Sequence, residues 1–483
     1  MDENRKRDWN RHLVLVPCPL QGHLNPMLSL ASVFHSKGFG VTLVLVQSSS
    51  HPAATSWASD DFFYESLGGS DGSIPSAPDV DLMRFLNEVN LKCKSSFRDC
   101  LMGLRMGRLR DRKLCVVYDA IMYFSAEVSD ELEIPRVVLR TSIVANFLGL
   151  SMLNQKAYLP AQEDGAVKAI QELIPSMRAR DMPVFDKSCP EATERVLAQI
   201  HESTSTASAI VWNTLQTLEQ ALLHRLQSSL SPPIFPIGPL HKYRTRDPRR
   251  RHHSSLFAAE TGARREEDRI KCVSFLDSHP PGSVVYVSTG SLVKLSRSEL
   301  AEMARGLADC GQRFLWAVGL SSADDGGIAQ LIPSGEELLC AAADCHPNAP
   351  SMRGLVVAWA PQEEVLAHGS VGCFWTHNGW NSTLESMTEG VPMLCWPWVG
   401  DQKIIAGFVT RVWRVGLELE CDGNGGLERG RISRSIERLM AGEEGREIKK
   451  RALEMKETVE LALSDGGCSS QSLSKLVDFI QLL

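Results

Sequence analysis

Short apolar runs, rich in β-branched residues, recur along the chain and alternate with segments that have helical patterns. They lie at 12–17, 41–46, 114–119, 135–140 and 209–214 in the first half, and at 283–288, 313–318, 354–361, 372–377 and 392–397 in the second. Uniformly apolar runs of this length are typical of parallel strands that helices cover on both faces. The two successive series predict an α/β protein with two doubly wound, Rossmann-like domains.

Two of the intervening helices carry boundary signals, and one long segment carries none. The first helix is predicted to start at Asn25 and Pro26 and to end before Gly38, and another is predicted over 296–311. Residues 244–268 are charged, lack apolar periodicity and follow a proline-rich stretch, so they are predicted to form a flexible linker. The basic run in this segment could also be a nucleic-acid patch, but a solvated linker is the commoner use.

Composition narrows the classes of function. The chain has 483 residues, of which 43% are apolar, with a formal net charge of -7 and a pI near 6.0. That charge argues against a partner bound through nucleic-acid phosphates. The thirteen cysteines form no C-x-x-C pair, which favours a reducing compartment over a disulfide framework or a zinc cluster. Because no apolar stretch reaches the length of a membrane span, the protein is expected in the cytoplasm and away from membranes.

The most informative segment runs from Trp359 to Gln402, WAPQEEVLAHGSVGCFWTHNGWNSTLESMTEGVPMLCWPWVGDQ. Within it, a predicted strand leads into HNGWNS and then into a helix. A helix start that carries Ser, Asn and His side chains suits a diphosphate. Alternatively, Asn381 and Ser382 only cap the helix.

This segment resembles the 44-residue donor-binding box of plant family 1 glycosyltransferases, and the resemblance extends over the chain, including QGHLNP at 21–26 and the C-terminal GGCSSQSLSKLVDFI. It implies the GT-B fold, in which two Rossmann-like domains face one another across a cleft. The acceptor would bind to an N-terminal domain, residues 1–243, and the UDP-sugar to a C-terminal domain, residues 269–460. A linker, residues 244–268, would join the two domains, and the helix within 461–483 would pack back on the N-terminal domain. The chain looks closest to the branch with benzoxazinoid, cytokinin and diterpenoid glucosyltransferases.

The same resemblance assigns residues to each part of a UDP-sugar. The residues implied are Trp359, Ala360 and Gln362 for uracil, Glu385 for ribose, Ser291, His377, Asn381 and Ser382 for the diphosphate, and Thr141, Trp380, Asp401 and Gln402 for the sugar. The residue types fit these tasks, since an indole provides a stacking surface and a carboxylate accepts two hydroxyl donors. A glutamine at the last position of the box implies glucose.

Two further residues follow predicted strands of the N-terminal half. His23 lies in a turn after the first strand, and Asp119 ends the strand LCVVYD, so both should reach the same edge of the sheet. The resemblance implies that His23 is the general base and that Asp119 orients it. An imidazole that titrates near neutrality suits the removal of a hydroxyl proton.

Other classes of enzyme fit the sequence less well. Asp79-Val80-Asp81 is the only Asp-x-Asp triplet in the sequence, and its context predicts a loop before a helix, so no metal is expected. A dinucleotide enzyme would need G-x-G-x-x-G where this chain has PCPLQGHLNP. A non-catalytic UDP-sugar-binding protein remains open.

The sequence therefore predicts an inverting, metal-independent UDP-glucosyltransferase without a further cofactor, acting as a monomer on a small apolar plant metabolite. Another UDP-hexose, and transfer to nitrogen or a carboxyl group, remain alternatives. The acceptor loops are expected at about 47–95, 141–165 and 176–205, where aromatic and methionine side chains tolerate varied shapes. Phenolics, flavonoids, terpenoids, cytokinin-like hormones and benzoxazinoids all remain possible acceptors. Thr289, Cys373, Trp398 and Val399 depart from the residues usual in this family, and they flank the donor site without removing a contact group.

Overall fold

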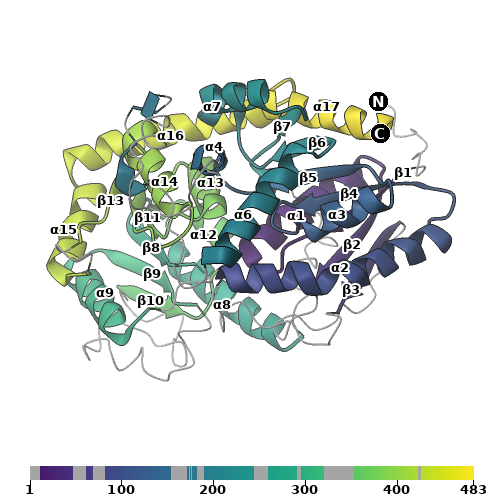
Figure 1. The fold of residues 1–483 in the computed structure, drawn as a ribbon. Helices are drawn as coiled ribbons and strands as arrows, with labels where there is room; N and C mark the ends of the chain where they lie inside the picture. Colours follow the sequence, from purple (N-terminus) through teal and green to yellow (C-terminus); the bar gives the residue numbers. More distant parts are fainter. Residues whose placement is uncertain are drawn as a thin grey trace. The chain divides into compact units, whose positions relative to one another are not determined.

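The computed structural model describes residues 11–46, 61–68, 82–153, 171–172, 174–175, 177–181, 190–243, 259–290, 295–319, 353–421 and 426–483. Contacts divide the chain into two compact units. Unit 1 comprises Met1–Leu173, Val184–Ala259 and Leu461–Leu483, and unit 2 comprises Ile174–Pro183 and Glu260–Glu460. Each unit is built around one parallel sheet (Figure 1).

The sheet of unit 1 has seven strands in the order β3-β2-β1-β4-β5-β6-β7. Their bounds are β1 Arg11–Val16, β2 Gly40–Val46, β3 Phe62–Leu67, β4 Lys113–Asp119, β5 Arg136–Arg140, β6 Ala209–Trp212 and β7 Ile234–Pro236. All the strand pairs are parallel. The direction in which the chain adds strands reverses between β1 and β4, and doubly wound sheets bind ligands at such a point.

Helices cover this sheet and bury its apolar strands. They are α1 Gln21–Ser36, α2 Leu82–Met106, α3 Phe124–Glu131, α4 Val144–Leu153, α6 Pro190–Ser205, α7 Gln216–Ser229 and the C-terminal α17 Cys468–Leu482, with short 3-10 turns at Ala179–Asp181 (η2, in unit 2) and Leu240–Tyr243 (η3). Leu473, Leu476 and Ile480 of α17 join the core formed by β1, β2, β4 and α1. Figure 1 shows α17 beside β7, and Ser469 Oγ donates to the Gly238 carbonyl at 2.8 Å.

The sheet of unit 2 has six strands in the order β10-β9-β8-β11-β12-β13, again all parallel. The strands are β8 Val284–Ser288, β9 Arg313–Ala317, β10 Gly354–Val357, β11 Val371–Thr376, β12 Met393–Cys395 and β13 Gly416–Glu418. The helices are α8 Ala259–Asp277, α9 Arg297–Asp309, α12 Gln362–Leu366, α13 Trp380–Glu389, α14 Gln402–Gly407, α15 Arg429–Met440 and α16 Glu443–Leu463, with a π-helical turn, η5, at Phe408–Val412. The prediction of two doubly wound parallel sheets is confirmed.

Three helix boundaries test the sequence-based predictions. The helix predicted over 296–311 is α9, and Ser296 caps it in a capping box with Glu299. The first helix begins at Gln21, so the prediction of a start at Asn25 and Pro26 is wrong, and Pro26 lies inside α1. Residues 259–268, predicted as the end of a flexible linker, form the first half of α8, whereas 244–258 lie outside the described residues. The linker prediction failed there because this helix is charged over most of its first turns.

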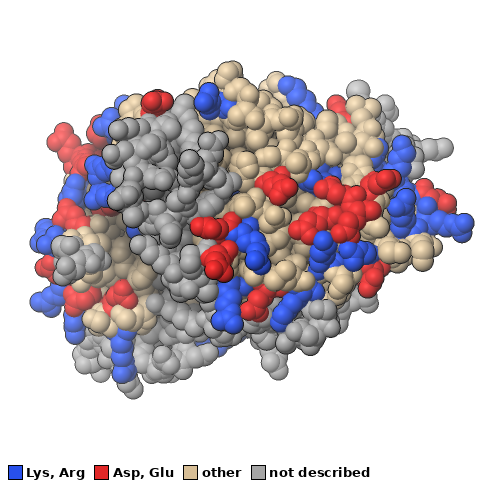
Figure 2. Space-filling view, viewed as in Figure 1, with Lys and Arg blue, Asp and Glu red and all other residues tan. Residues whose placement is uncertain are grey.

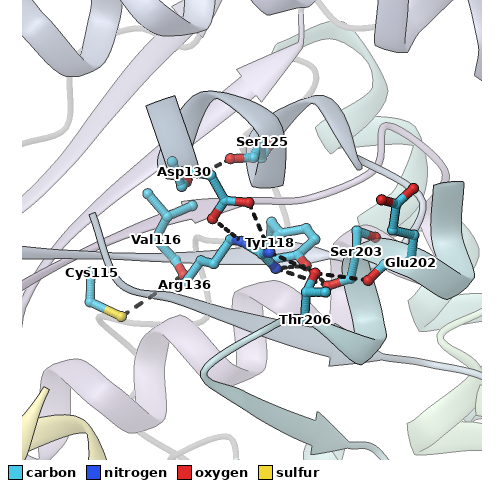
Figure 3. A network of polar contacts seen from close by, with 10 residues as sticks. Cys115, Val116, Tyr118, Ser125, Asp130, Arg136, Glu202, Ser203 and Thr206 are labelled. Carbon is cyan, nitrogen blue, oxygen red and sulfur yellow. Dashed lines mark hydrogen bonds and ion pairs between the residues drawn. The ribbon is translucent and has the colours of Figure 1, made fainter. Parts of the chain in front are cut away.

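A buried arginine fixes the strands beside the reversal point (Figure 3). Arg136 is 4% exposed, and its Nε and Nη2 donate to both oxygens of Asp130 on α3 at 2.6 and 2.9 Å. Its Nη1 donates to the Tyr118 hydroxyl at 3.1 Å and to the Ser203 carbonyl of α6 at 2.9 Å. A buried charge with this many partners is satisfied. The network therefore ties α3 and α6 to the end of β4, next to Asp119.

The described surface carries mixed charge. On the face shown in Figure 2, acidic and basic side chains are interspersed over α2 and α3, where Lys94 pairs with Glu127 and Glu131 and Arg98 pairs with Glu131. Such exposed pairs contribute little to stability. Among the described helices, none has the length and apolarity that crossing a bilayer requires.

His12, a buried histidine on β1, makes the stability of unit 1 depend on pH. Its Nε2 lies 2.8 Å from Thr42 Oγ1, and its ring stacks with Phe63. Burial, followed by the nearby Arg112 guanidinium, lowers the pKa of His12 to about 3. The unfolded chain therefore binds a proton between pH 6.5 and 3 that the folded chain does not, so stability is lost as the pH falls through this window.

We expect His12 alone to remove about 2 kcal/mol of unfolding free energy between pH 7 and pH 5. Urea titrations at the two pH values measure this loss in the unchanged protein and in His12→Gln, which cannot titrate. The variant should lose about 2 kcal/mol less than the unchanged protein over the same interval. Equal losses in both proteins would show that His12 does not carry the dependence.

Candidate active site

Three side chains meet at the carboxyl ends of neighbouring strands in unit 1. His23 lies in the first turn of α1, which follows β1, Asp119 is the last residue of β4, and Thr141 follows β5. Since β1, β4 and β5 are adjacent in a parallel sheet, these ends share one edge. The predicted pair His23 and Asp119 is thus brought together, although His23 belongs to a helix rather than to the predicted turn.

The imidazole of His23 is held through one of its two nitrogens. Its Nδ1 lies 2.8 Å from Asp119 Oδ2 and 3.0 Å from Thr141 Oγ1. The Asp119 side chain is 1% exposed, and its other oxygen accepts the Ile121 backbone N–H at 3.0 Å. The His23 side chain is 24% exposed. One carboxylate is thus fixed in place, and one partly accessible imidazole is oriented by it.

This geometry selects the tautomer that a base needs. A carboxylate oxygen only accepts, so Nδ1 must carry the proton that it donates to Asp119. Nε2 of a neutral His23 is then the lone-pair nitrogen and can accept a proton. The carboxylate also stabilises the imidazolium that results. The arrangement can therefore perform general base catalysis.

The loop that carries Thr141 is held by two residues that sequence reasoning missed. Trp212 Nε1 on β6 donates to the Ser142 carbonyl at 2.6 Å. Glu219 on α7 is 2% exposed and accepts the backbone N–H of Val144, at the start of α4, at 2.8 Å. It also accepts the Thr214 hydroxyl at 2.7 Å. The contacts with Ser142 and Val144 join residues 70 and 75 positions apart, so no local signal in the sequence could have revealed them.

We expect Glu219→Ala to lower kcat by about 10-fold to 100-fold, because displacement of a catalytic group by about 1 Å has effects of this size. The substitution leaves the Val144 N–H and the Thr214 hydroxyl buried without their acceptor. Glu219→Gln keeps an acceptor oxygen and should recover most of the activity. Steady-state kinetics on both variants, with circular dichroism to verify folding, provide the measurement. Equal kcat values in Ala, Gln and unchanged proteins would remove Glu219 from this role.

A second cluster forms at the reversal point of the unit 2 sheet, between β8 and β11. His377 follows β11, and its imidazole lies between two glycines. A Cβ placed on Gly290 or Gly379 would lie 2.7 or 2.5 Å from ring atoms of His377, so only glycine fits at either position. Burial lowers the pKa of His377 to about 4, with a hydrogen bond to the Ser288 backbone opposing the shift. Near pH 7 this imidazole is neutral.

Helix α13 follows His377, and its N-terminal geometry shows whether Asn381 and Ser382 act as caps. Its N-cap is Gly379, and Asn381 and Ser382 are the second and third residues of the helix. The alternative in which these two side chains serve only as caps is therefore not what the structure shows. Instead, Ser382 Oγ accepts a hydrogen bond from Gln362 Nε2 at 2.8 Å. The first turn of a helix presents backbone N–H groups that favour an anion.

Gln362 contacts two other predicted donor residues, Ser382 and Glu385. Its Nε2 donates to Glu385 Oε2 at 2.6 Å as well as to Ser382, and its Oε1 accepts the Tyr286 hydroxyl at 3.3 Å. Both ends of the amide are thus engaged within the protein. Gln362, predicted at the uracil edge, is placed where it orients the Glu385 carboxylate.

Two more of the predicted donor residues, Trp359 and Ala360, lie at the same edge of the sheet. Trp359 follows β10, is partly exposed and lies next to the buried Ala360. The Arg265 guanidinium lies 5.4 Å from the centroid of the Trp359 ring. Ser291 lies outside the described residues, as does the Asp79-Val80-Asp81 triplet. Among the described residues, no group of His, Cys, Asp and Glu has the arrangement of a metal site.

The residues predicted to bind the sugar differ in their exposure. Asp401 is partly exposed, whereas Gln402 is buried and its Oε1 accepts the backbone N–H groups of Trp398 and Val399 at 2.8 and 3.0 Å. Trp380 is 4% exposed and packs against Trp413, so its indole is part of the core.

Comparisons with known proteins identify the family. The family model described as "UDP-glucoronosyl and UDP-glucosyl transferase" matches residues 248–421. UDP-glycosyltransferase 76E1 of Solanum lycopersicum is 37% identical over 490 residues, covering 99% of this chain and 94% of that protein. Flavonol 3-O-glucosyltransferase UGT76E12 of Arabidopsis thaliana is 35% identical over 484 residues, covering 98% of this chain and 97% of that protein.

A solved structure extends the comparison to the fold. Phytolacca americana UGT2, complexed with UDP-2fluoro-glucose and pterostilbene, superposes with a TM-score of 0.77 at 26% identity, covering 98% of this chain and 100% of that chain. The chain therefore belongs to the plant family 1 UDP-glycosyltransferases, and it has their GT-B fold. It is an enzyme that transfers a sugar from a UDP-sugar donor, and the resemblance found in the sequence is confirmed.

Proposed function

We propose that this enzyme transfers glucose from UDP-glucose to a hydroxyl of a small apolar plant metabolite with inversion, giving a β-glucoside. The observation that carries the proposal is the 2.8 Å contact between His23 Nδ1 and Asp119 Oδ2 at the carboxyl edge of the unit 1 sheet. This contact leaves Nε2 as the basic nitrogen of a partly exposed imidazole.

In the proposed reaction one bond forms at the anomeric carbon, one bond breaks there, and His23 takes the proton. The acceptor oxygen attacks the anomeric carbon of the donor while His23 Nε2 takes its proton, and the bond from that carbon to the UDP oxygen breaks. Attack on the face opposite UDP inverts the α configuration of the donor. Asp119 stabilises the imidazolium, as carboxylates do in related catalytic pairs. UDP leaves with the electron pair and with the negative charge of its diphosphate.

We propose that unit 2 holds this donor through its own residues. The neutral His377, the first turn of α13 with Asn381 and Ser382, and Ser291 would hold the diphosphate. Glu385, oriented by Gln362, would accept the ribose hydroxyls, and uracil would stack on Trp359 beside Ala360. The positive end of the helix and the hydrogen-bond donors would supply the stabilisation, so we propose that no metal or other cofactor is required.

We propose that Asp401 and Gln402 select glucose by binding its hydroxyls, with Thr141 near the reacting centre. Because Gln402 Oε1 accepts two backbone N–H groups, its Nε2 is the end of the amide that would donate to a sugar hydroxyl. Trp380 would contribute through its backbone, since its indole is buried. We further propose that the enzyme acts as a monomer in the cytoplasm.

Turnover with a panel of acceptors tests the proposal. Purified protein, UDP-glucose and a chelator are incubated with phenolics, terpenoids and hormones, and products are identified by mass spectrometry while UDP release is followed. Phenolics come first, because one relative is named for flavonols and the solved structure holds pterostilbene. A hexose adduct formed in chelator is expected. Loss of all activity in chelator would contradict the metal-free mechanism.

A further inference from the structure

Helix α8 reaches the segment that begins with Trp359 through one face. Arg265, Asp268 and Arg269 are spaced by three and four residues, so they lie on one side of the helix. Each of them contacts a residue of the 359–364 segment. This part of the chain looks like a charged linker in the sequence, yet it supports the proposed base-binding site.

The first two contacts converge on Trp359 itself. The Arg265 guanidinium lies over the indole, 5.4 Å from its centroid, within the range of a cation–π interaction. Arg265 is half-buried, and its Nε has no hydrogen-bond partner among the described residues. The Asp268 carboxylate is 5% exposed; burial raises its pKa, the backbone N–H of Trp359 opposes this shift by donating to it, and its Oδ2 has no hydrogen-bond partner among the described residues. One side chain thus holds the ring and the other holds the backbone of the same residue.

The third contact holds the neighbouring helix. Arg269 Nε and Nη2 donate to the two carboxylate oxygens of Glu364 at 2.8 and 2.9 Å. This bidentate pair links α8 to α12, although both side chains are partly exposed and the pair adds little to stability. Gln362, which orients Glu385, is the first residue of α12. The contacts from α8 therefore reach the first and the last residue of the segment from Trp359 to Glu364.

We propose that Arg265 and Asp268 are positioning residues that hold Trp359 ready to stack on a planar base, so that α8 sets the affinity for the nucleoside part of the donor. The inference rests on the proposed UDP-sugar site. A ring already fixed on one face and at its backbone loses little freedom when a base stacks on its other face. Neither residue needs to touch the diphosphate, the sugar or the acceptor.

The test compares Arg265→Met, Arg265→Lys and Asp268→Ala with Arg264→Met, which removes an exposed arginine one position away. Arg265→Met keeps the apolar stem of the side chain and loses the guanidinium. We expect the KM for UDP-glucose and the inhibition constant of UDP to rise about fivefold in this variant. A cation–π contact of about 1 kcal/mol gives a factor of this size. Asp268→Ala should act in the same direction. Arg265→Lys should restore part of the affinity, and kcat should stay within about twofold in all four variants.

Inorganic diphosphate is the probe that separates positioning from general damage. Its inhibition constant should not change in Arg265→Met or Asp268→Ala, because it has no base to stack. Equal weakening of UDP and diphosphate, or unchanged UDP binding in both variants, would overturn the inference. Calorimetry of the unchanged protein with UDP comes first. If UDP does not bind to the unchanged protein, that result contradicts the proposed function rather than the role of α8.

Discussion

Replacing His23 with alanine is expected to lower kcat by about 100-fold to 10,000-fold, the contribution typical of a positioned general base. The substitution removes the only imidazole in contact with Asp119 among the described residues. The donor is proposed to bind to unit 2, so the KM for UDP-glucose should change little. Single-turnover kinetics at saturating donor and acceptor measure the chemical step directly.

The control for His23 is His224→Ala, which removes an exposed histidine from α7 in the same unit. Its kcat should equal that of the unchanged protein. A further variant, Asp119→Asn, should lose less than His23→Ala if the carboxylate acts through the imidazole. Unchanged turnover in His23→Ala would exclude this residue as the base.

The second large effect is expected from Gly290→Ala, which should weaken UDP binding by about 10-fold to 100-fold. The new Cβ would lie 2.7 Å from Cε1 and Nε2 of His377, closer than two such atoms can approach. The imidazole must therefore move away from the place where it would meet the diphosphate. Calorimetric titration with UDP gives the dissociation constant.

Gly282→Ala is the matched control for this prediction. Both glycines have positive φ, at +80° for Gly290 and +66° for Gly282, so each substitution strains the backbone by a similar amount. A Cβ on Gly282 meets no atom within 4 Å. Only Gly290→Ala should lose UDP affinity. Equal affinities in the two variants would show that His377 does not contact the diphosphate.

Much of the fold could be predicted from the sequence because central strands of parallel sheets are apolar throughout. The ten apolar runs correspond to β1, β2, β4, β5, β6 and β8 to β12. The three strands without a prediction, β3, β7 and β13, all lie at sheet edges. There β3 is only partly buried, β7 includes Pro236 and β13 spans three residues. Edge strands bury less surface, so their sequences carry a weaker signal.

The candidate site also has residues that sequence patterns indicate and supporting residues that they do not. The 359–402 segment could be singled out because its fixed spacing belongs to one continuous motif. The proximity of His23 and Asp119 could be predicted because His23 follows one apolar strand and Asp119 ends another. Glu219 and Arg265 could not be predicted, because each acts on a loop that is far away along the chain. Such supporting contacts are encoded only in the packing of elements against one another.

The anomeric configuration of the product shows whether the enzyme transfers glucose with inversion. The glucoside made from UDP-glucose by the unchanged protein is isolated, and the coupling between its H1 and H2 is measured by proton NMR. We expect the large coupling of a β-glucoside, formed by one inverting attack with His23 as base. An α-glucoside, or a product made equally fast by His23→Ala, would contradict this mechanism.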